Sequence, residues 1–331
     1  MQRIKELDFL KGVLILLVIS FHLVYFEQLH PDIKQVVYTF HMPGFLLISG
    51  YLMNISKEPK DFLRTLLWLS VPYLVMESGY IYMASLLPIN EHIYNLNPKV
   101  FLDHLFLHPL GPYWYLHTLI LCGGLYYWTL SYSPLKGESH VAKEALPLRE
   151  GLGGSASWRW SRFILIGIVY YVLARGLGIL TFSSSLYFLA GAVLRQSGKD
   201  FLLFFLPTRL SVVAFALLAC FSKFPTQASL NGALIVYFAI STILWSYNHL
   251  PFKGRMGGVF LGRNSLPLYV FSPIFTVLCK QFVPYLKFDP TGLLFLAVSL
   301  AFCVVGSLLI AWLMDFVGIS KYFFGRKALS M

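Results

Sequence analysis

Long apolar segments separated by short polar stretches make up most of the chain. There are about ten such segments, each about 18 to 24 residues long, the length that an α-helix needs to cross roughly 30 Å of hydrocarbon. No run alternates apolar and polar residues as a β-strand does. The pattern predicts an all-α fold, a polytopic transmembrane helical bundle. Its expected spans lie near residues 9–27, 36–55, 62–86, 113–132, 160–175, 177–194, 202–221, 229–247, 259–282 and 292–314.

The composition agrees with this pattern. Of the 331 residues, 57% are hydrophobic and only 12% are charged, and the mean hydropathy is +0.67. A typical soluble domain carries about 25% charged residues. We therefore expect a multi-pass membrane protein and not a soluble enzyme.

The Lys and Arg residues indicate the orientation of the bundle. When the spans alternate and the N-terminus is placed in the cytoplasm, most of the 26 Lys and Arg residues fall on the inner side, as the positive-inside rule requires. Both termini are then cytoplasmic. This bias, together with contacts to anionic lipids of the membrane, explains the net charge of +11, so we expect no nucleic-acid partner. The outer side keeps Lys34, Lys99, Arg175, Lys223, Lys280 and Lys287, and Arg209 lies in a span.

No segment is polar enough to form a separate soluble domain. We therefore expect a single integral-membrane domain over residues 1–331, with a cytoplasmic loop near 133–159 and an outer loop near 87–112. The inner loop contains "GLGGSAS" and reads as a flexible connection. The outer loop is rich in His, Pro and aromatic residues, which favours a folded cap over a tether.

Ionisable residues inside the expected spans are the main candidates for chemistry. Lys11 and His22 are separated by ten residues, and eleven steps of about 100° on one continuous helix return to nearly the same face. We expect a cation near the inner headgroups and an imidazole above it. Snorkelling of Lys11 and a satisfied core histidine are the alternatives, but intramembrane ionisable residues are usually functional.

A second imidazole and a carboxylate are expected at a similar depth. His41 lies near the outer end of the second span, and Glu77 lies in the outer half of the third. Paired with a histidine, Glu77 would orient the ring and stabilise an imidazolium; the alternative is a structural hydrogen bond. At the inner side Arg64 and Arg263 add cations. Pro43, Gly44, Ser49 and Gly50 allow close approach of a helix or a ligand.

Several of these motifs together resemble the membrane-bound acyltransferase-3 family, which includes fucose 4-O-acetylase-like proteins and surface-polysaccharide O-acetyltransferases. The resemblance rests on "LDFLKG" followed by His22, and on "FHMPGFLLISGYL", "YWYL", "YFLAGAVL" and "LGRNSLPLYVF". It covers the chain from about residue 6 to the tenth span. One departure is Ser272, at a position where members often have His.

The resemblance implies a ten-helix bundle in the bacterial cytoplasmic (inner) membrane. Such a protein takes an acyl group, commonly acetyl from acetyl-CoA, and delivers it to a hydroxyl of a glycan or lipid-linked sugar. Lys11 and His22 correspond to the family's basic-His motif, and Ser49 and Gly50 to its Ser-Gly pair. No metal is expected.

Two mechanisms and one rival function follow. We expect CoA phosphates at Lys11, Arg64 and Arg263, with Ser49 in the donor crevice, and His22, His41 and Glu77 as catalytic residues. His22 acts either as general base on the sugar hydroxyl or as the group that is acylated first. The rival is a transporter or flippase for a glycan or anionic solute, in which His and Glu relay protons. A scaffolding role would leave His22, His41 and Glu77 unexplained.

Overall fold

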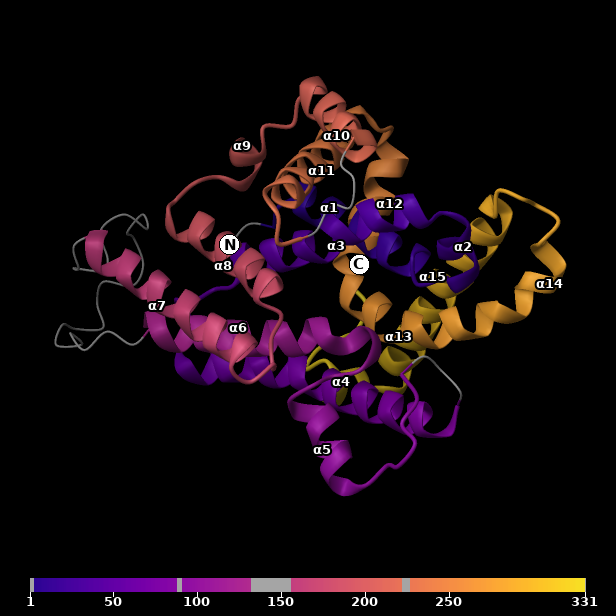
Figure 1. Cartoon of the computed structure of the whole chain (residues 1–331), viewed down its shortest axis with the longest axis horizontal. Coiled ribbons are helices and arrows are strands. Elements are labelled where there is room, and N and C mark those ends of the chain that lie inside the picture. The colour runs from indigo at the N-terminus through magenta and orange to yellow at the C-terminus, as the bar shows by residue number, and fades with distance from the viewer. Residues whose placement is uncertain (1–2, 88–90, 132–155, 222–226, 331) are drawn as a thin grey trace. The chain divides into compact units, whose positions relative to one another are not determined.

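The computed structural model describes residues 3–87, 91–131, 156–221 and 227–330. These residues form α-helices and short 3₁₀-helices, and they contain no β-strand (Figure 1). The predicted all-α fold is therefore confirmed for the described part of the chain. By their internal contacts the residues form two compact units: unit 1 is Met1–Phe45 and Phe205–Met331, and unit 2 is Leu46–Phe204. The predicted inner loop lies mostly outside the described residues.

Unit 1 is organised around α1, which packs along α12 and also contacts α11, α13 and α15. Helix α15 packs on α13, and α10 packs on α11. The helices of this unit are α1 (Lys5–Ser20), α2 (Val24–Leu29), the first part of α3 (Pro31–Leu52), α10 (Arg209–Phe221), α11 (Leu230–His249), α12 (Phe252–Arg263), α13 (Ser265–Leu278), η2 (Cys279–Phe282), α14 (Val283–Leu286), α15 (Leu293–Val317) and α16 (Ser320–Phe323).

Glycines allow α1 and α12 to approach each other at backbone distance. A Cβ atom added at Gly12 would lie 2.0 Å from the carbonyl oxygen of Gly258. One added at Gly262 would lie 1.6 Å from the carbonyl oxygen of Asp8. No side chain fits in either place, so small residues determine this helix pair, as they do in membrane bundles generally. The contact brings the start of α1 against the end of α12.

In unit 2, α4 packs against α5 and α6, and α6 packs against α7 and α8. The second part of α3 meets α8 closely, because a Cβ atom at Gly50 would lie 2.0 Å from the carbonyl oxygen of Phe188. The close approach expected at Gly50 is thus made by a helix. The helices of this unit are the remainder of α3, α4 (Pro59–Leu86), α5 (Pro98–Phe106), η1 (Gly111–Tyr113), α6 (Trp114–Ser131), α7 (Ala156–Arg175), α8 (Phe182–Gln196) and α9 (Phe201–Phe205), whose last residue belongs to unit 1.

The described part of the segment expected as an outer loop is folded, as the sequence predicted. Within it, α5 begins at Pro98, and the side chain of Asn97 directly before it accepts a hydrogen bond from the backbone N–H of Val100 and so caps the helix. Ile93 and Leu105 then pack with residues of α4 in one buried apolar cluster. The described part of this segment is therefore a cap on α4.

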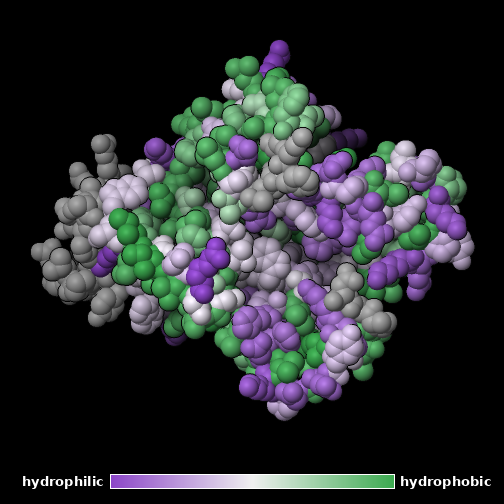
Figure 2. Space-filling model, viewed as in Figure 1, coloured by the Kyte–Doolittle hydropathy of each residue, from purple (hydrophilic) through white to green (hydrophobic). Residues whose placement is uncertain are grey.

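Three helical segments among the described residues are long and apolar enough to cross a membrane: Leu230–His249, Ser265–Leu286 and Leu293–Val317. Helix α10 is shorter but exposes an apolar face, which Figure 2 shows as a hydrophobic surface over this helix. Its exposed residues recur every three or four positions along one face; they are Leu210, Val213, Leu217 and Phe221. Such a face requires an apolar surrounding, as expected for a membrane protein.

The predicted first span is not one continuous helix. Helix α1 ends at Ser20 and α2 begins at Val24. The backbone N–H groups of His22 and Leu23 donate to the carbonyls of Ile19 and Ser20, three residues back, which tightens and ends the last turn. The expectation that one unbroken helix carries both Lys11 and His22 is therefore wrong.

Two other predicted spans are also divided. Residues 259–282 separate at Asn264 into α12 and α13, and residues 202–221 are divided between α9, which ends at Phe205, and α10, which starts at Arg209. The side-chain amide of Asn264 donates to the carbonyl oxygen of Phe260 at 2.9 Å. This local hydrogen bond competes with the backbone ladder and favours a helix end.

Candidate active site

His22 lies in the break between α1 and α2, and its side chain is exposed. Because the backbone N–H of His22 bonds to Ile19, the carbonyl of Val18 loses its usual partner from four residues ahead. The imidazole ring of His22 replaces the missing backbone donor, because its Nδ1 lies 2.7 Å from the carbonyl oxygen of Val18. The end of α1 therefore fixes the orientation of the imidazole.

This contact also determines the tautomer of His22. A carbonyl oxygen can only accept a hydrogen bond, so Nδ1 carries the hydrogen. In the neutral ring Nε2 then holds the lone pair. An Nε2 with a lone pair can accept a proton or attack a carbonyl carbon, the two reactions expected of a catalytic histidine.

His41 has the same local arrangement inside α3. Its Nδ1 lies 2.6 Å from the carbonyl oxygen of Val37, and the side chain is 3% exposed. Both histidines contact Tyr38. The ring of Tyr38 stacks on His41 with 5.1 Å between centroids, and its centroid lies 6.3 Å from that of His22. The structure thus brings the two imidazoles to one aromatic side chain.

Tyr38 is anchored to the same break. Its hydroxyl donates to the carbonyl oxygen of Phe21 at 2.8 Å, and Phe21 directly precedes His22 in the chain. The hydroxyl also lies 3.4 Å from Glu27 Oε2. Tyr38 therefore connects α3 to the backbone that carries His22.

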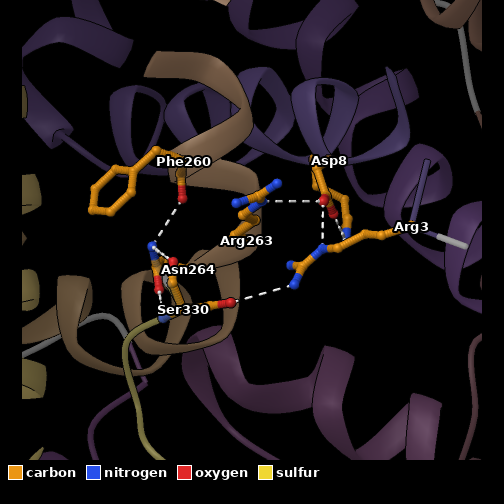
Figure 3. Close-up of polar contacts among 7 residues, drawn as sticks. Arg3, Asp8, Phe260, Arg263, Asn264 and Ser330 are labelled. Atoms are coloured by element: carbon orange, nitrogen blue, oxygen red, sulfur yellow. Dashed lines mark hydrogen bonds and ion pairs between the residues drawn. The ribbon is translucent and has the colours of Figure 1, made fainter. Parts of the chain in front are cut away.

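A cluster of charged side chains lies at the start of α1, where α12 approaches it (Figure 3). We call Arg3, Asp8, Lys11 and Arg263 the basic cluster. Asp8 is at its centre and is only 3% exposed. Its Oδ2 lies 2.7 Å from Arg3 Nε and 3.7 Å from Arg263 Nε, and its Oδ1 lies 2.9 Å from Lys11 Nζ. With three cations around one carboxylate, the cluster has an excess of two positive charges and can attract an anion.

The segment after α16 is fastened beside this cluster. Asn264 Oδ1 accepts from the backbone N–H of Ser330 at 2.8 Å, and Arg3 Nη1 donates to the hydroxyl of Ser330 at 3.3 Å (Figure 3). Asp315 accepts from the backbone N–H groups of Ala328 and Leu329 at 2.6 and 3.0 Å. Asn264 therefore holds this segment against α12.

Two predicted donor-binding residues belong to unit 2. Arg64 is exposed on α4, whereas Lys11 and Arg263 are in unit 1. Ser49, on the second part of α3, has its hydroxyl 2.8 Å from the hydroxyl of Tyr115. Of the residues expected to bind the donor, Lys11 and Arg263 are those that the structure brings together.

Glu77 also belongs to unit 2, where it is fully buried on α4. Its Oε1 accepts from the backbone N–H of Leu110 at 2.7 Å, and its Oε2 has no hydrogen-bond partner among the described residues. Glu91 accepts in the same way from the N–H of Gly111 at 2.7 Å. Leu110 directly precedes η1 and Gly111 is its first residue, positions where N–H groups lack helical partners. The observed partner of Glu77 is thus a backbone amide. This agrees with a structural hydrogen bond, the alternative to pairing with a histidine.

Sequence reasoning passed over Asp8 and Tyr38. Asp8 stands in the motif "LDFLKG", three residues before Lys11, a spacing at which opposite charges meet on a helix. The charge pair could therefore have been found from the sequence. Tyr38 lies three residues before His41 and could have been found in the same way, but its contact with His22 depends on the break after α1.

No group of three or more His, Cys, Asp or Glu residues in the described ranges is arranged to hold a metal ion.

Comparison with known proteins identifies the family. The model of the acyltransferase-3 family (Acyl_transf_3), described as an acyltransferase domain, matches residues 4–312, nearly the whole chain. No protein of curated function and no solved structure matches it. The chain belongs to the acyltransferase-3 family, so its activity is acyl transfer.

Proposed function

We propose that this acyltransferase transfers an acetyl group from cytoplasmic acetyl-CoA to a hydroxyl of a glycan or lipid-linked sugar. The transfer takes place across the cytoplasmic membrane of a bacterium, with the acceptor at the outer side. The family match supports acyl transfer, and the apolar helices support a membrane location. The donor, the acceptor and the direction are our proposal.

The observation that carries this proposal is the orientation of His22. Its Nδ1–H is donated to Val18, so Nε2 is available as a base. In the proposed reaction Nε2 takes the proton of the sugar hydroxyl as its oxygen attacks the thioester carbonyl. The C–S bond then breaks, and the imidazolium returns the proton to the leaving thiolate. One new ester and one thiol result.

The basic cluster is the proposed site for the phosphates of the donor. It lies in unit 1 together with His22, and its cations outnumber its carboxylate by two. Arginine and lysine donate several hydrogen bonds each, so contact with Asp8 does not exhaust them. Ser20 is nine residue positions after Lys11 on α1, or about 14 Å at 1.5 Å per residue. The extended arm of CoA would follow this length toward the break.

The other predicted residues receive supporting roles. His41, held by Val37 and stacked on Tyr38, would position Tyr38 and through it the break that carries His22. Glu77 would hold the segment before α6 by its hydrogen bond to Leu110. Arg64 and Ser49 remain candidates for contacts along the donor.

The test is replacement of His22 by Ala in membranes supplied with radiolabelled acetyl-CoA. Loss of a general base costs roughly 10²- to 10⁴-fold in rate, so transfer should fall by at least 100-fold. His249→Ala is the matched control, because His249 donates from Nδ1 to Trp245 at 2.9 Å in the same manner but lies outside the proposed site. Full transfer by His22→Ala would contradict the proposal.

A second experiment separates direct transfer from an acyl-enzyme. Purified protein is incubated with labelled acetyl-CoA in the absence of acceptor and then denatured. With His22 as a general base, the denatured protein carries no label. Stoichiometric label that is lost in His22→Ala would instead show that Nε2 is acetylated first.

A further inference from the structure

A pocket of about 330 Å³ lies in unit 1 beside Tyr38. Its size is at the lower end of the range for small-molecule sites, roughly 300–1,000 Å³, so it suits a ligand of one or two rings. All but one of its lining residues come from the first turns of α3. The lining consists of Pro31, Lys34, Gln35, Tyr38, Thr39 and Gln227.

The walls of this pocket are held in place by polar contacts. Gln227 donates from Nε2 to the carbonyl oxygen of Tyr38 at 2.8 Å. Lys34 Nζ lies 3.1 Å from Glu27 Oε2 and 5.2 Å from the centroid of the Tyr38 ring. Tyr38 itself is hydrogen-bonded to Phe21. The pocket is therefore formed before a ligand binds, which lowers the entropic cost of binding.

The chemistry of the lining matches a sugar. Gln35 and Gln227 carry amides that can both donate and accept, as sugar hydroxyls do, and Tyr38 offers an aromatic ring. Lys34 is compensated by Glu27, so it adds a donor to the lining without net charge. The pocket thus differs from the basic cluster, where positive charge is in excess.

We propose that this pocket binds the acceptor as an uncharged sugar ring whose hydroxyl faces His22. Tyr38 lines the pocket and also contacts His22 and His41, so the pocket and the two imidazoles share this side chain. The assignment rests on the proposed function, since it names the place where that reaction's acceptor is bound. Lys34, Gln35 and Gln227 are then specificity-determining residues.

The assignment is tested by blocking the pocket with a covalent adduct, and the acceptor in the test is the glycan that the producing cells themselves make. In a Cys220→Ser background, which removes the exposed cysteine, Gln35→Cys is modified with a methyl or a benzyl methanethiosulfonate. Membranes of these cells, with their own glycans, then receive radiolabelled acetyl-CoA. The benzyl adduct should lower label in glycan at least tenfold, and the methyl adduct less than threefold. Pro31→Cys is a second position should Gln35→Cys fold poorly.

Lys287→Cys, modified in the same way, is the control, because Lys287 is exposed in unit 1 and does not line the pocket. An unchanged rate with the benzyl adduct at both pocket positions would overturn the assignment. His22→Ala is measured in parallel. Retained transfer in His22→Ala contradicts the proposed function, whereas loss in His22→Ala with no effect of the adducts contradicts the pocket alone.

The charge of the acceptor is tested with Glu27→Gln and Lys34→Met. For an uncharged ring Lys34→Met removes a donor from the lining, and Glu27→Gln removes the charge that holds Lys34 in place, so each should raise the acceptor concentration needed for half-maximal transfer about threefold. An anionic acceptor would respond with opposite signs, because Glu27→Gln removes a repelling charge and Lys34→Met removes an attracting one. Opposite signs would overturn the uncharged-sugar assignment.

Discussion

Asp8 in unit 1 and Glu77 in unit 2 are both buried carboxylates on helices, yet they are satisfied in different ways. Asp8 is surrounded by the side chains of Arg3, Lys11 and Arg263. Glu77 has no ion-pair partner among the described residues, and its hydrogen bond comes from the backbone of Leu110. Asp8 therefore binds cationic side chains, whereas Glu77 holds the backbone before η1 in place.

This difference separates a binding role from a structural one. Cationic side chains gathered by a buried carboxylate keep donors and net positive charge for an outside anion. A backbone amide has one hydrogen, and a carboxylate that accepts it has only stabilised the fold. Buried ionisable groups in membrane helices are a sign of function, but the identity of the partner decides which function.

The largest effect is expected from Asp8→Asn. The substitution keeps the volume but leaves three neighbouring cations without their counter-charge. Removal of one partner from a buried ion pair costs on the order of 3 kcal/mol, so the thermal midpoint in detergent should fall clearly. The cations would also lose their common position, and the KM for acetyl-CoA should rise at least tenfold.

Glu6→Gln is the control for Asp8→Asn, because Glu6 is also an acidic residue in the first turn of α1 and has no place in the basic cluster. Its KM for acetyl-CoA should stay within twofold of wild type. A lower KM in Asp8→Asn would show that Asp8 competes with the donor for the cations, contrary to an organising role.

The second effect concerns the helix contact that brings Arg263 to Asp8. Gly262→Ala places a Cβ atom 1.6 Å from the carbonyl oxygen of Asp8 and must force α1 and α12 apart. Overpacking of this kind costs about 1–3 kcal/mol, and the KM for acetyl-CoA should rise several-fold. Gly257→Ala, on the same helix with no atom within 4 Å of the added Cβ, should change neither quantity adversely. Equal behaviour of the two variants would mean that the close approach does not matter.

The pattern of apolar residues was sufficient to predict the helices but not the places where they break. Segment length and hydropathy predicted the all-α fold, and the expected span at 292–314 corresponds to α15 (Leu293–Val317). The break after Ser20 depends on hydrogen bonds three residues back and on the His22 ring. An apolar sequence such as "VISFHLVYF" gives no sign of either.

The candidate site could be predicted only in part from the sequence, for a similar reason. His22, His41, Lys11 and Arg263 could be selected one at a time as ionisable residues in apolar surroundings. Their neighbours could not, because Tyr38 reaches His22 through the fold, and Arg263 reaches Asp8 through glycines on two helices. The partner of Glu77 is a backbone amide, a group that every residue except proline carries and that no sequence pattern distinguishes.

The third effect tests the structural reading of Glu77 directly. Glu77→Gln keeps an oxygen that can accept from Leu110, so stability should change by less than about 1 kcal/mol and most acetyl transfer should remain. Glu77→Ala removes the acceptor and leaves a buried N–H unpaired, which costs about 1–3 kcal/mol. Thermal unfolding and transfer are measured for both. A stable Glu77→Gln without activity would instead support the catalytic role expected from the sequence, in which Glu77 orients a histidine and stabilises its imidazolium.

The smallest effect is expected at a third carboxylate, Asp289, which also binds backbone but is exposed to solvent. Its Oδ2 accepts from the N–H of Leu294 at 2.8 Å and its Oδ1 from the N–H of Thr291 at 2.9 Å, at the start of α15. The hydrogen bond from Leu294, followed by that from the Thr291 hydroxyl, lowers the pKa of Asp289 below its ordinary value of 3.8. Because the folded state favours the ionised form, its stabilising contribution is complete above pH 3.8 and is lost as the pH falls through the lowered pKa. Hydrogen-exchange protection of Leu294 should therefore exceed that in Asp289→Ala by a constant factor at neutral pH, and the factor should shrink only below pH 3.8. A factor that already declines between about pH 7 and pH 5 would mean that another group controls this helix start, and that a carboxylate on backbone amides is not what holds it.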